Sequence, residues 1–410
     1  MKYGLIGEKL GHSFSRTIHE MLSDNLYELR EIPKDELDGF MKSKSFSGIN
    51  VTIPYKESVI PYLDEIDEGA REIGAVNAIV NRCGKLIGYN TDFYGMQKLF
   101  LHAGIDAKGK RAAILGSGGT SRTAMAVLRS LGADEILRVS RSGKDGNITY
   151  DELYSRHSDI EIIVNTTPMG MFPNIDGAAV DVSKFENLSG VIDAVYNPIR
   201  TQLVLDAMAK GIAAEGGLYM LVAQAVRASE IFLDTNYSED IIEKIYRKIN
   251  GEKESIVLIG MPACGKSTVG KILAKKTGRT LVDTDELIVK KVGMEITEIF
   301  RQYGEDKFRD IESEVIAEIS GNGSLIIATG GGAILRDKNV RSLKKNGRLY
   351  FIDRPLDALV PTDSRPLSSD RTAIEKRYEE RYGIYSSVCD KKIDADCDAE
   401  TVAEKILENF

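Results

Sequence analysis

The sequence contains no tryptophan and has only four histidines and four cysteines in 410 residues. The cysteines, Cys83, Cys264, Cys389 and Cys397, form no CxxC pair, which favours free thiols in a reducing compartment over a disulfide framework or a zinc site. Four histidines also leave little scope for histidine-based catalysis or a His-rich metal site.

Long apolar segments are also missing. No run approaches the roughly 18 residues that a membrane-spanning helix needs, and the start, MKYGLIGEKLGHSFS, lacks the hydrophobic stretch and cleavage site of a signal peptide. The net charge of -8 and the isoelectric point near 5.4 argue against a nucleic-acid or anionic-membrane surface. We therefore expect a cytoplasmic protein with no membrane or nucleic-acid partner, whose ligands can be small anionic metabolites. The sequence does not indicate an oligomeric state.

Short apolar runs alternate with helical patterns along the whole chain. Runs such as KYGLIG, SGINVTI, RAAILGSG and IEIIVNTT alternate with amphipathic segments such as SRTAMAVLRSLG. A second series of runs begins at SIVLIG, after the polar segment RKINGEKES. This alternation predicts an α/β fold with parallel sheets wrapped in helices, and the length suits two or three domains.

The second series opens with a phosphate-binding pattern. Gly260, Gly265, Lys266 and Ser267 satisfy GxxxxGK[ST], with Thr268 next, between an apolar strand and a helical pattern. In such a loop the backbone N–H groups and the helix dipole hold phosphate oxygens, the lysine reaches the outer phosphates and the hydroxyl binds magnesium. A glycine-rich turn that binds nothing is the alternative, but the full pattern predicts a site for ATP and Mg2+.

Two acids follow the next apolar run, in VDTDELI. Strand alternation would place Asp283 and Asp285 on the same side, one facing magnesium and the other a substrate hydroxyl. A solvated helix N-cap is the simpler alternative. In FRQYGEDKFRDIESE, Arg309 and Glu312 are three apart on an expected helix, so the carboxylate either orients the guanidinium or forms an ordinary surface ion pair.

Three glycines leave the next strand directly, in ATGGG. Gly330, Gly331 and Gly332 indicate close approach of a ligand to the backbone. Further along, SRPL contains Arg365 on an expected loop, and RYGIY contains Arg381.

In this order, GKST, DTD, GEDKFRDIE, ATGGG, SRPL and RYGIY resemble the shikimate kinase family over residues 255–410. The resemblance implies a P-loop kinase with a parallel sheet. It implies that Asp283 lies on the magnesium side with Ser267, and that Asp285 grips substrate hydroxyls and acts as the base beside Lys266. It assigns the remaining ligand contacts as follows: Arg309 and Arg381 to the shikimate carboxylate, Gly331 and Gly332 to its ring, and Arg365 to the ATP phosphates as a lid arginine. The lid segment LVPTDSRPL is shorter and less basic than is usual in that family.

A second glycine loop occurs earlier, in RAAILGSGGTSRTAMAVLRSLG. Gly116, Gly118 and Gly119 stand between a strand and a helical pattern, although Ser121 holds the last position of GxGxxG. After the next strand, EILRVSRSGK carries basic and hydroxyl side chains where an NAD site would carry an acid: Ser140, Arg141, Ser142 and Lys144. A basic surface turn is the alternative, but with the glycine loop this predicts a Rossmann domain that binds NADP(H).

Polar residues upstream of that loop form further motifs. Ser13 and Ser15 precede a helix, as a carboxylate grip or as an N-cap and its neighbour. Lys56 follows the strand in GINVTIPYKES, and Asp92 lies in YNTDFYG. Each is alone most simply a surface charge, yet together they are the natural acid–base candidates for moving a proton at a carbonyl.

In this order these motifs, with NTTPMGM, VYNPIRT and GLYMLVAQA, resemble the shikimate dehydrogenase family over residues 1–248. The resemblance implies that Ser13 and Ser15 bind the substrate carboxylate and that Lys56 and Asp92 form the catalytic pair. It places Thr52, Asn77, Asp92 and Gln224 at ring hydroxyls, Tyr196 near substrate, and Asn165, Thr166 and Met169 on the cofactor side.

The two resemblances together imply an α/β chain of three domains. The expected parts are a substrate domain at 1–95 to which the helices of 218–248 return, a Rossmann NADP domain at 96–217, a linker at 249–254 and a P-loop kinase domain at 255–410. The implied function is NADPH-dependent reduction of 3-dehydroshikimate to shikimate and ATP-dependent phosphorylation of shikimate to shikimate 3-phosphate. A quinate or quinate/shikimate dehydrogenase, a shikimate sensor with one inactive half, and a kinase for gluconate or a nucleotide remain the alternatives.

Overall fold

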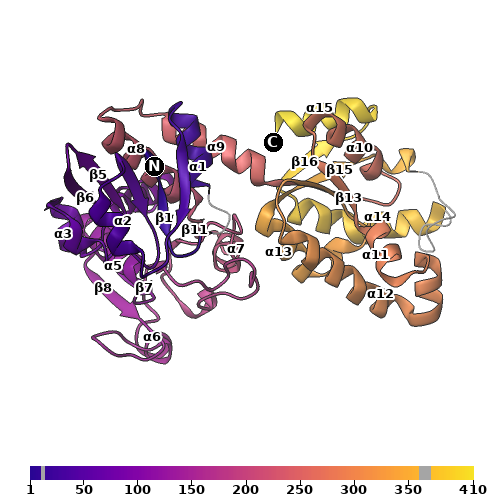
Figure 1. Ribbon diagram of the computed structural model, residues 1–410. Coiled ribbons are helices and arrows are strands. Elements are labelled where there is room, and N and C mark those ends of the chain that lie inside the picture. Colours follow the sequence, from indigo (N-terminus) through magenta and orange to yellow (C-terminus); the bar gives the residue numbers. More distant parts are fainter. Residues whose placement is uncertain (11–13, 360–370) are drawn as a thin grey trace. The chain divides into compact units, whose positions relative to one another are not determined.

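The structure, a computed structural model, describes residues 1–10, 14–359 and 371–410. These residues form two compact units. The first combines Met1–Asn197 with Thr201–Ile249, and the second combines Asn250–Phe410 with the tripeptide Pro198–Arg200. The first unit contains two β-sheets and the second contains one (Figure 1). The segment expected to link two domains, 249–254, is mostly helical, because α9 runs from Ile241 to Lys253.

The first sheet of the first unit is mixed. β1 pairs in parallel with β2 and β3, whereas β5 pairs antiparallel with β3 and β6. The sheet therefore departs from the all-parallel pattern expected from the sequence. For β5 and β6 the physical reason is the two-residue turn that joins them, in which Cys83 and Gly84 both have positive φ, 53° and 91°. In the order β2-β1-β3-β5-β6-β4, the strands are Tyr27–Glu31, Tyr3–Gly7, Gly48–Val51, Ala78–Arg82, Lys85–Tyr89 and Glu65–Ile66.

The second sheet of this unit is entirely parallel, as a dinucleotide-binding fold requires. Its central strands β9 and β10 are fully buried and mostly apolar, since helices cover both faces of such a sheet. In the order β11-β10-β9-β7-β8, the strands are Ala213–Glu215, Gly190–Asp193, Ile162–Asn165, Arg111–Leu115 and Glu135–Val139.

Some helices of the first unit begin at side-chain caps. Asn90 caps α4 by accepting from the Phe93 N–H, and Thr149 and Glu152 form a capping box at α6. The long helix α8 packs against α1, α4, β3 and β5, which brings residues after 217 back to the first sheet. The helices are α1 (Ser15–Leu22), α2 (Leu37–Ser43), α3 (Glu68–Ile73), α4 (Thr91–His102), α5 (Gly119–Ser130), α6 (Tyr150–Arg156), α7 (Gln202–Ala209) and α8 (Leu218–Leu233), with 3-10 turns at Ile60–Tyr62 and Val182–Lys184.

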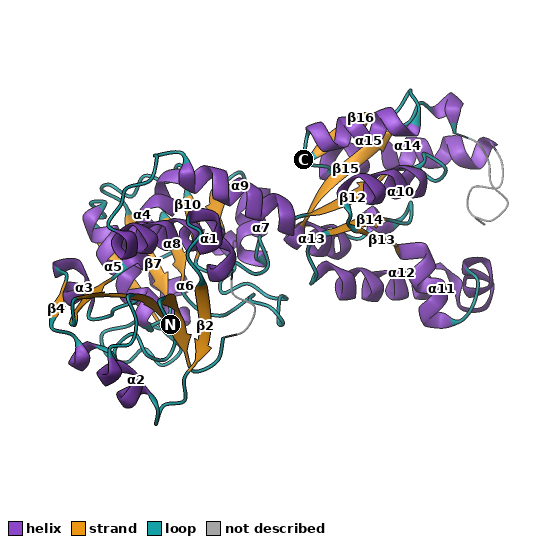
Figure 2. Ribbon diagram, turned by 45° about the horizontal axis from the view of Figure 1, so that its top comes forward, coloured by secondary structure: helices purple, strands orange, loops and turns teal. Residues whose placement is uncertain are grey.

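The sheet of the second unit is parallel throughout. Its middle strand, β12, is buried along its whole length and leads directly into the phosphate-binding pattern. Helices surround the strands of each unit (Figure 2). In the order β13-β14-β12-β15-β16, the strands are Thr280–Asp283, Leu325–Ala328, Ser255–Ile259, Gly347–Asp353 and Lys391–Asp394. The helices are α10 (Lys266–Thr277), α11 (Thr284–Val292), α12 (Ile296–Ser320), α13 (Asp337–Asn346), α14 (Arg371–Val388) and α15 (Ala399–Glu408), with 3-10 turns at Ala333–Leu335 and Leu356–Ala358.

Within the described residues, no helix combines the length and the apolar character that crossing a bilayer would require.

Candidate active sites

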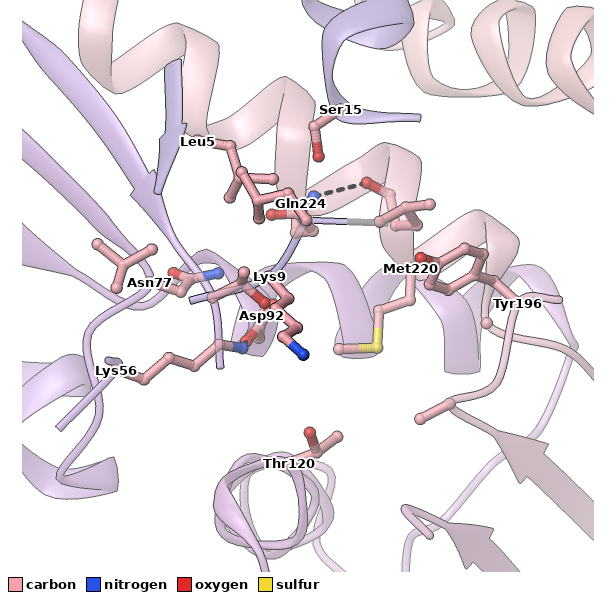
Figure 3. A pocket seen from close by; sticks show the side chains of 16 residues that line it. Leu5, Lys9, Ser15, Lys56, Asn77, Asp92, Thr120, Tyr196, Met220 and Gln224 are labelled. Carbon is pink, nitrogen blue, oxygen red and sulfur yellow. Dashed lines mark hydrogen bonds and ion pairs between the residues drawn. The ribbon is translucent and has the colours of Figure 1, made fainter. Parts of the chain in front are cut away.

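A cavity of about 350 Å3 opens in the first unit, and an ion pair lies on its wall. Lys56 comes from the turn after β3, and Asp92 lies in the first turn of α4. Lys56 Nζ donates to Asp92 Oδ2 over 2.6 Å, with the two side chains 24% and 13% exposed. Figure 3 shows both side chains at the hollow, with Thr120 of α5 on its other side. A cation and a carboxylate are thus held together where a small molecule can reach them.

Amide and hydroxyl groups line the same cavity. Asn77 is fixed by Thr91, which receives its Nδ2–H at 3.1 Å and donates its own N–H to Asn77 Oδ1 at 2.7 Å. Gln224 of α8 donates to the Leu221 carbonyl at 2.8 Å (Figure 3), and its Oε1 accepts from the Thr91 hydroxyl at 3.4 Å. The predicted substrate residues that line the cavity are Ser15, Thr52, Lys56, Asn77, Asp92, Tyr196 and Gln224. Ser13 lies outside the described residues.

Several lining residues were not anticipated. Lys9 contributes a second cation, and Met220 an apolar side chain, beside the predicted polar groups. Thr120 directly follows the glycine loop, so that position could have been chosen from the sequence, whereas nothing in the pattern around Lys9 distinguished it. Thr120 shows that the cavity reaches the start of α5, where the predicted cofactor loop lies.

The first glycine loop is built for close approach. Gly116 has φ of 111°, and a Cβ there would lie 2.7 Å from Thr166 Oγ1. Thr166 in turn donates to the Leu115 carbonyl at 2.7 Å, which fixes the loop. Gly118 occupies the N-cap of α5, and Gly119 starts that helix. The loop therefore offers backbone and a helix N-terminus to a pyrophosphate.

The other predicted cofactor residues fall into an exposed and a buried set. Arg141, Ser142 and Lys144 are exposed after β8, and Ser140 Oγ accepts from the Gly143 N–H at 3.1 Å. These side chains fit a site for a 2'-phosphate. Asn165, in contrast, is fully buried at the end of β9 and donates to Asp193 Oδ1 at 2.9 Å. Its Oδ1 accepts from the Thr167 N–H at 3.0 Å, which shapes the following turn. Met169 is 49% exposed in that turn.

Burial also shifts the pKa of a carboxyl group behind this turn. It raises the pKa of Asp193 to about 6, although hydrogen bonds from Thr201, Val195 and Asn165 act in the opposite direction.

The phosphate-binding pattern of the second unit forms the expected loop between β12 and α10. Gly265 is the helix N-cap with φ of 100°, and Gly260 has φ of 149°. Lys266 is 5% exposed, and its Nζ donates to the carbonyls of Gly260 at 2.8 Å and Met261 at 2.9 Å. The lysine thus lies against the loop with which it is expected to bind phosphates.

Ser267, Asp283 and Asp285 line one cavity of about 520 Å3. Ser267 Oγ donates to Asp283 Oδ2 at 2.8 Å, and Asp283 Oδ1 accepts from the Asp285 N–H at 3.0 Å. The sequence predicted that the two acids alternate on one strand, and this prediction was wrong. Asp283 ends β13 and caps α11, and Asp285 belongs to the first helical turn.

The oxygens of Ser267 and Asp283 fit a magnesium ion, which takes few protein ligands and keeps several waters. No group of three or more His, Cys, Asp or Glu side chains suited to a metal occurs among the residues that the structure describes.

A guanidinium is fixed beside the glycines that follow β14. Arg309 Nη1 lies 2.8 Å from Glu312 Oε2, and its Nη2 lies 3.0 Å from Glu305 Oε1. A Cβ at Gly332 would come within 2.2 Å of Arg309 Nη1, and one at Gly330 would lie 2.6 Å from Asp285 Oδ1. Burial raises the pKa of Glu312. Glycine at both positions therefore lets the backbone pass close to the charged groups without displacing them.

Arg381, on α14, joins the same region. Its Nη1 donates to the Gly331 carbonyl at 3.0 Å, and the Tyr385 hydroxyl donates to the same oxygen. Pro262 of the phosphate loop faces Gly331, a contact that the sequence did not reveal. The predicted lid arginine, Arg365, lies outside the described residues.

Comparisons with known proteins match both parts of the chain. The model of the shikimate dehydrogenase substrate binding domain family matches residues 5–79, and that of the shikimate kinase family matches residues 262–410. The "Shikimate dehydrogenase (NADP(+))" of Clostridium perfringens strain SM101 is 39% identical over 265 residues, which cover 60% of this chain and 97% of that protein. That of Halothermothrix orenii is 40% identical over 258 residues, 56% of this chain and 89% of that protein.

Solved structures agree with these matches. Shikimate dehydrogenase 1 from Peptoclostridium difficile superimposes with a TM-score of 0.56 at 40% identity, covering 62% of this chain and 99% of that one. A chorismate mutase/shikimate 5-dehydrogenase fusion protein from Clostridium acetobutylicum gives 0.58 at 37% identity, covering 60% and 96%. The chain therefore belongs to the shikimate dehydrogenase family and carries, at residues 262–410, a domain of the shikimate kinase family.

Proposed function

We propose that this chain is a bifunctional enzyme that reduces 3-dehydroshikimate to shikimate with NADPH and then phosphorylates shikimate with ATP and Mg2+. The observation that carries the proposal is the Lys56–Asp92 pair, held at 2.6 Å on the wall of a cavity that also reaches the glycine-loop helix at Thr120. A carbonyl reduction needs a proton donor and a cofactor loop on the same cavity.

In the first unit, NADPH supplies the hydride when it is bound. Lys56 Nζ hydrogen-bonds the substrate carbonyl oxygen and gives it a proton as the carbon is reduced. Asp92 holds the lysine and accepts a hydrogen bond from a ring hydroxyl. Asn77 and Gln224 orient further hydroxyls, and Ser15 with Ser13 binds the carboxylate. Gly116, Gly118 and Gly119 approach the pyrophosphate, while Ser140, Arg141, Ser142 and Lys144 receive the 2'-phosphate.

In the second unit, Asp285 accepts the proton of a shikimate hydroxyl as the phosphoryl group is transferred. Arg309, held by Glu312 and Glu305, binds the carboxylate of the ring acid together with Arg381. Lys266 and the N–H groups of Gly265 and Ser267 balance the charge of the phosphates, since phosphoryl transfer depends mainly on positioning and charge neutralisation. Ser267 and Asp283 hold Mg2+.

A coupled assay on the full chain tests both activities together. With 3-dehydroshikimate, NADPH, ATP and Mg2+, loss of NADPH and formation of ADP should occur in proportion. Lys56→Ala should abolish NADPH loss and, with it, ADP formation from 3-dehydroshikimate, while ADP formation from added shikimate remains. Asp285→Asn should abolish ADP formation from added shikimate and leave NADPH loss intact. NADPH consumption without ADP, or ADP formation from shikimate in a chain that reduces nothing, would leave one half as a binding module and refute the bifunctional proposal.

A further inference from the structure

Arg354 is an arginine for which the described structure provides no partner. It directly follows β15, the strand that pairs with β12 beside the phosphate-binding loop. Its Nε is buried and has no hydrogen-bond partner, and no hydrogen bond or ion pair joins the guanidinium to any residue within 1–10, 14–359 or 371–410. A charged group that is partly removed from water is normally paired, so this exception points to a missing ligand.

Nearby acids do not compensate this charge because other cations hold them. Asp353, the preceding residue, lies 2.7 Å from Lys392 Nζ and also accepts from the Tyr382 hydroxyl. Asp357, three residues further on, pairs with Arg371 at 3.0 Å. Unlike Arg354, the other described arginines of the site have partners, since Arg309 is held by two carboxylates and Arg381 by a carbonyl.

The guanidinium faces the phosphate-binding loop. A Cβ built at Gly265 would lie 4.0 Å from Arg354 Nη1, and no other described atom outside its chain neighbours and helix backbone comes as close. Gly265 is the N-cap of α10, so its N–H and those that follow point toward the place where phosphate oxygens bind. Arg354 therefore lies on one side of that place, with the helix N-terminus on another.

We propose that Arg354 binds the phosphate chain of the nucleotide held by residues 260–268, an inference that rests on the proposed kinase function. A guanidinium keeps its charge at any physiological pH and offers two parallel N–H groups to phosphate oxygens. It supplies a phosphate-binding cation from the residue that directly follows β15, apart from the segment that contains Arg365. Its role is to bind and orient the phosphates alongside Lys266.

Calorimetric titration of the full chain with ADP and with inorganic tripolyphosphate tests this assignment. Arg354→Gln should weaken both ligands about tenfold, which corresponds to about 1.4 kcal/mol. Arg354→Lys should recover part of the loss, because the charge remains but the two-pronged geometry does not. Arg341→Gln removes an equally charged side chain from the exposed face of α13 and should leave both affinities unchanged.

The outcomes separate this inference from the function on which it rests. If Arg354→Gln binds both ligands as tightly as the wild type, or if only ADP is weakened while tripolyphosphate is not, the phosphate contact is refuted. If Arg354→Gln loses its fold by circular dichroism, Arg354→Lys decides. Wild-type affinity of that variant for both ADP and tripolyphosphate also refutes the two-pronged contact. A wild-type chain that binds neither ligand would instead overturn the nucleotide site itself.

Discussion

Lys56 Nζ lies 2.6 Å from Asp92 Oδ2, although 36 residues separate the two in sequence. The lysine follows a strand and the aspartate starts a helix, so only the folded first unit brings them together. Each is partly shielded from solvent, which makes their mutual hydrogen bond more effective than it would be between two surface charges.

Removing either member should slow reduction strongly. Lys56→Ala and Asp92→Asn should each lower kcat for NADPH oxidation by about 10²–10⁴, the usual contribution of a positioned acid or base. Steady-state assays with 3-dehydroshikimate measure the effect. Lys85→Ala is a matched control, because Lys85 is an exposed lysine paired with Glu65, and its rate should equal that of the wild type. A Lys56→Ala rate within threefold of the wild type would remove the lysine from the mechanism.

Gly332→Ala should weaken shikimate binding without disturbing the nucleotide. The added methyl would enter the space of the Arg309 guanidinium, at 2.2 Å from Nη1, and this flexible side chain must then swing away from its carboxylates. We expect KM for shikimate in the ADP-forming reaction to rise at least tenfold while ADP affinity stays the same. Gly383→Ala on α14, where a Cβ meets nothing within 4 Å, is the control and should leave KM unchanged. Equal KM values in both variants would show that Arg309 does not bind the substrate carboxylate.

Acid should destabilise the first unit through His19. Burial lowers the pKa of this histidine from 6.5 to about 3, and its ring stacks on Tyr27 at 4.0 Å. Between these two pH values the unfolded chain binds a proton that the folded chain rejects, so the free energy of unfolding falls as pH drops from 6.5 toward 3. The loss is on the order of a few kcal/mol.

Urea unfolding followed by circular dichroism at pH 7.5 and at pH 5 measures this dependence. His19→Phe keeps an aromatic ring beside Tyr27 and cannot titrate, so its loss of stability between the two pH values should be clearly smaller. A variant that loses as much stability as the wild type would show that His19 is not the group responsible.

Asp193 should have the opposite pH dependence. Burial raises its pKa to about 6, so between pH 3.8 and 6 the folded chain holds a proton that the unfolded chain releases. Its contribution to stability is complete below pH 3.8 and is lost as pH rises through 6. Asp193→Asn removes this loss, so relative to the wild type the variant should gain roughly 2–3 kcal/mol between pH 4 and pH 8. The same unfolding measurement at both pH values checks this, and a constant difference between variant and wild type would contradict it.

The local patterns predicted most of the elements that carry the sites. The strand, glycine turn and helix around Lys266 and around Gly118 lie where the sequence indicated, because such patterns depend on residues close together in the chain. The catalytic candidates Lys56 and Asp92 were recognised from residue type and resemblance, and the structure supplied the distance between them.

Other features were predicted wrongly or not at all. Strand alternation failed for Asp283 and Asp285, because the first acid ends its strand and caps the next helix. The antiparallel pairing of β5 and β6 depends on a turn at Cys83 and Gly84 that no glycine or proline pair announced. The positions of Lys9 at the cavity and of Arg354 beside Gly265 depend on the folded chain. A lysine or an arginine within a loop pattern does not indicate which residues it will contact.

Lys266 already bonds to two carbonyls of its own loop. A ligand that recruits this lysine has to replace both bonds, and a single orthophosphate offers few oxygens for the exchange. A polyphosphate can engage the lysine, the helix N-terminus and further cations at once, so the total of its contacts exceeds what the loop gives up. We therefore expect the loop to favour polyphosphates over orthophosphate.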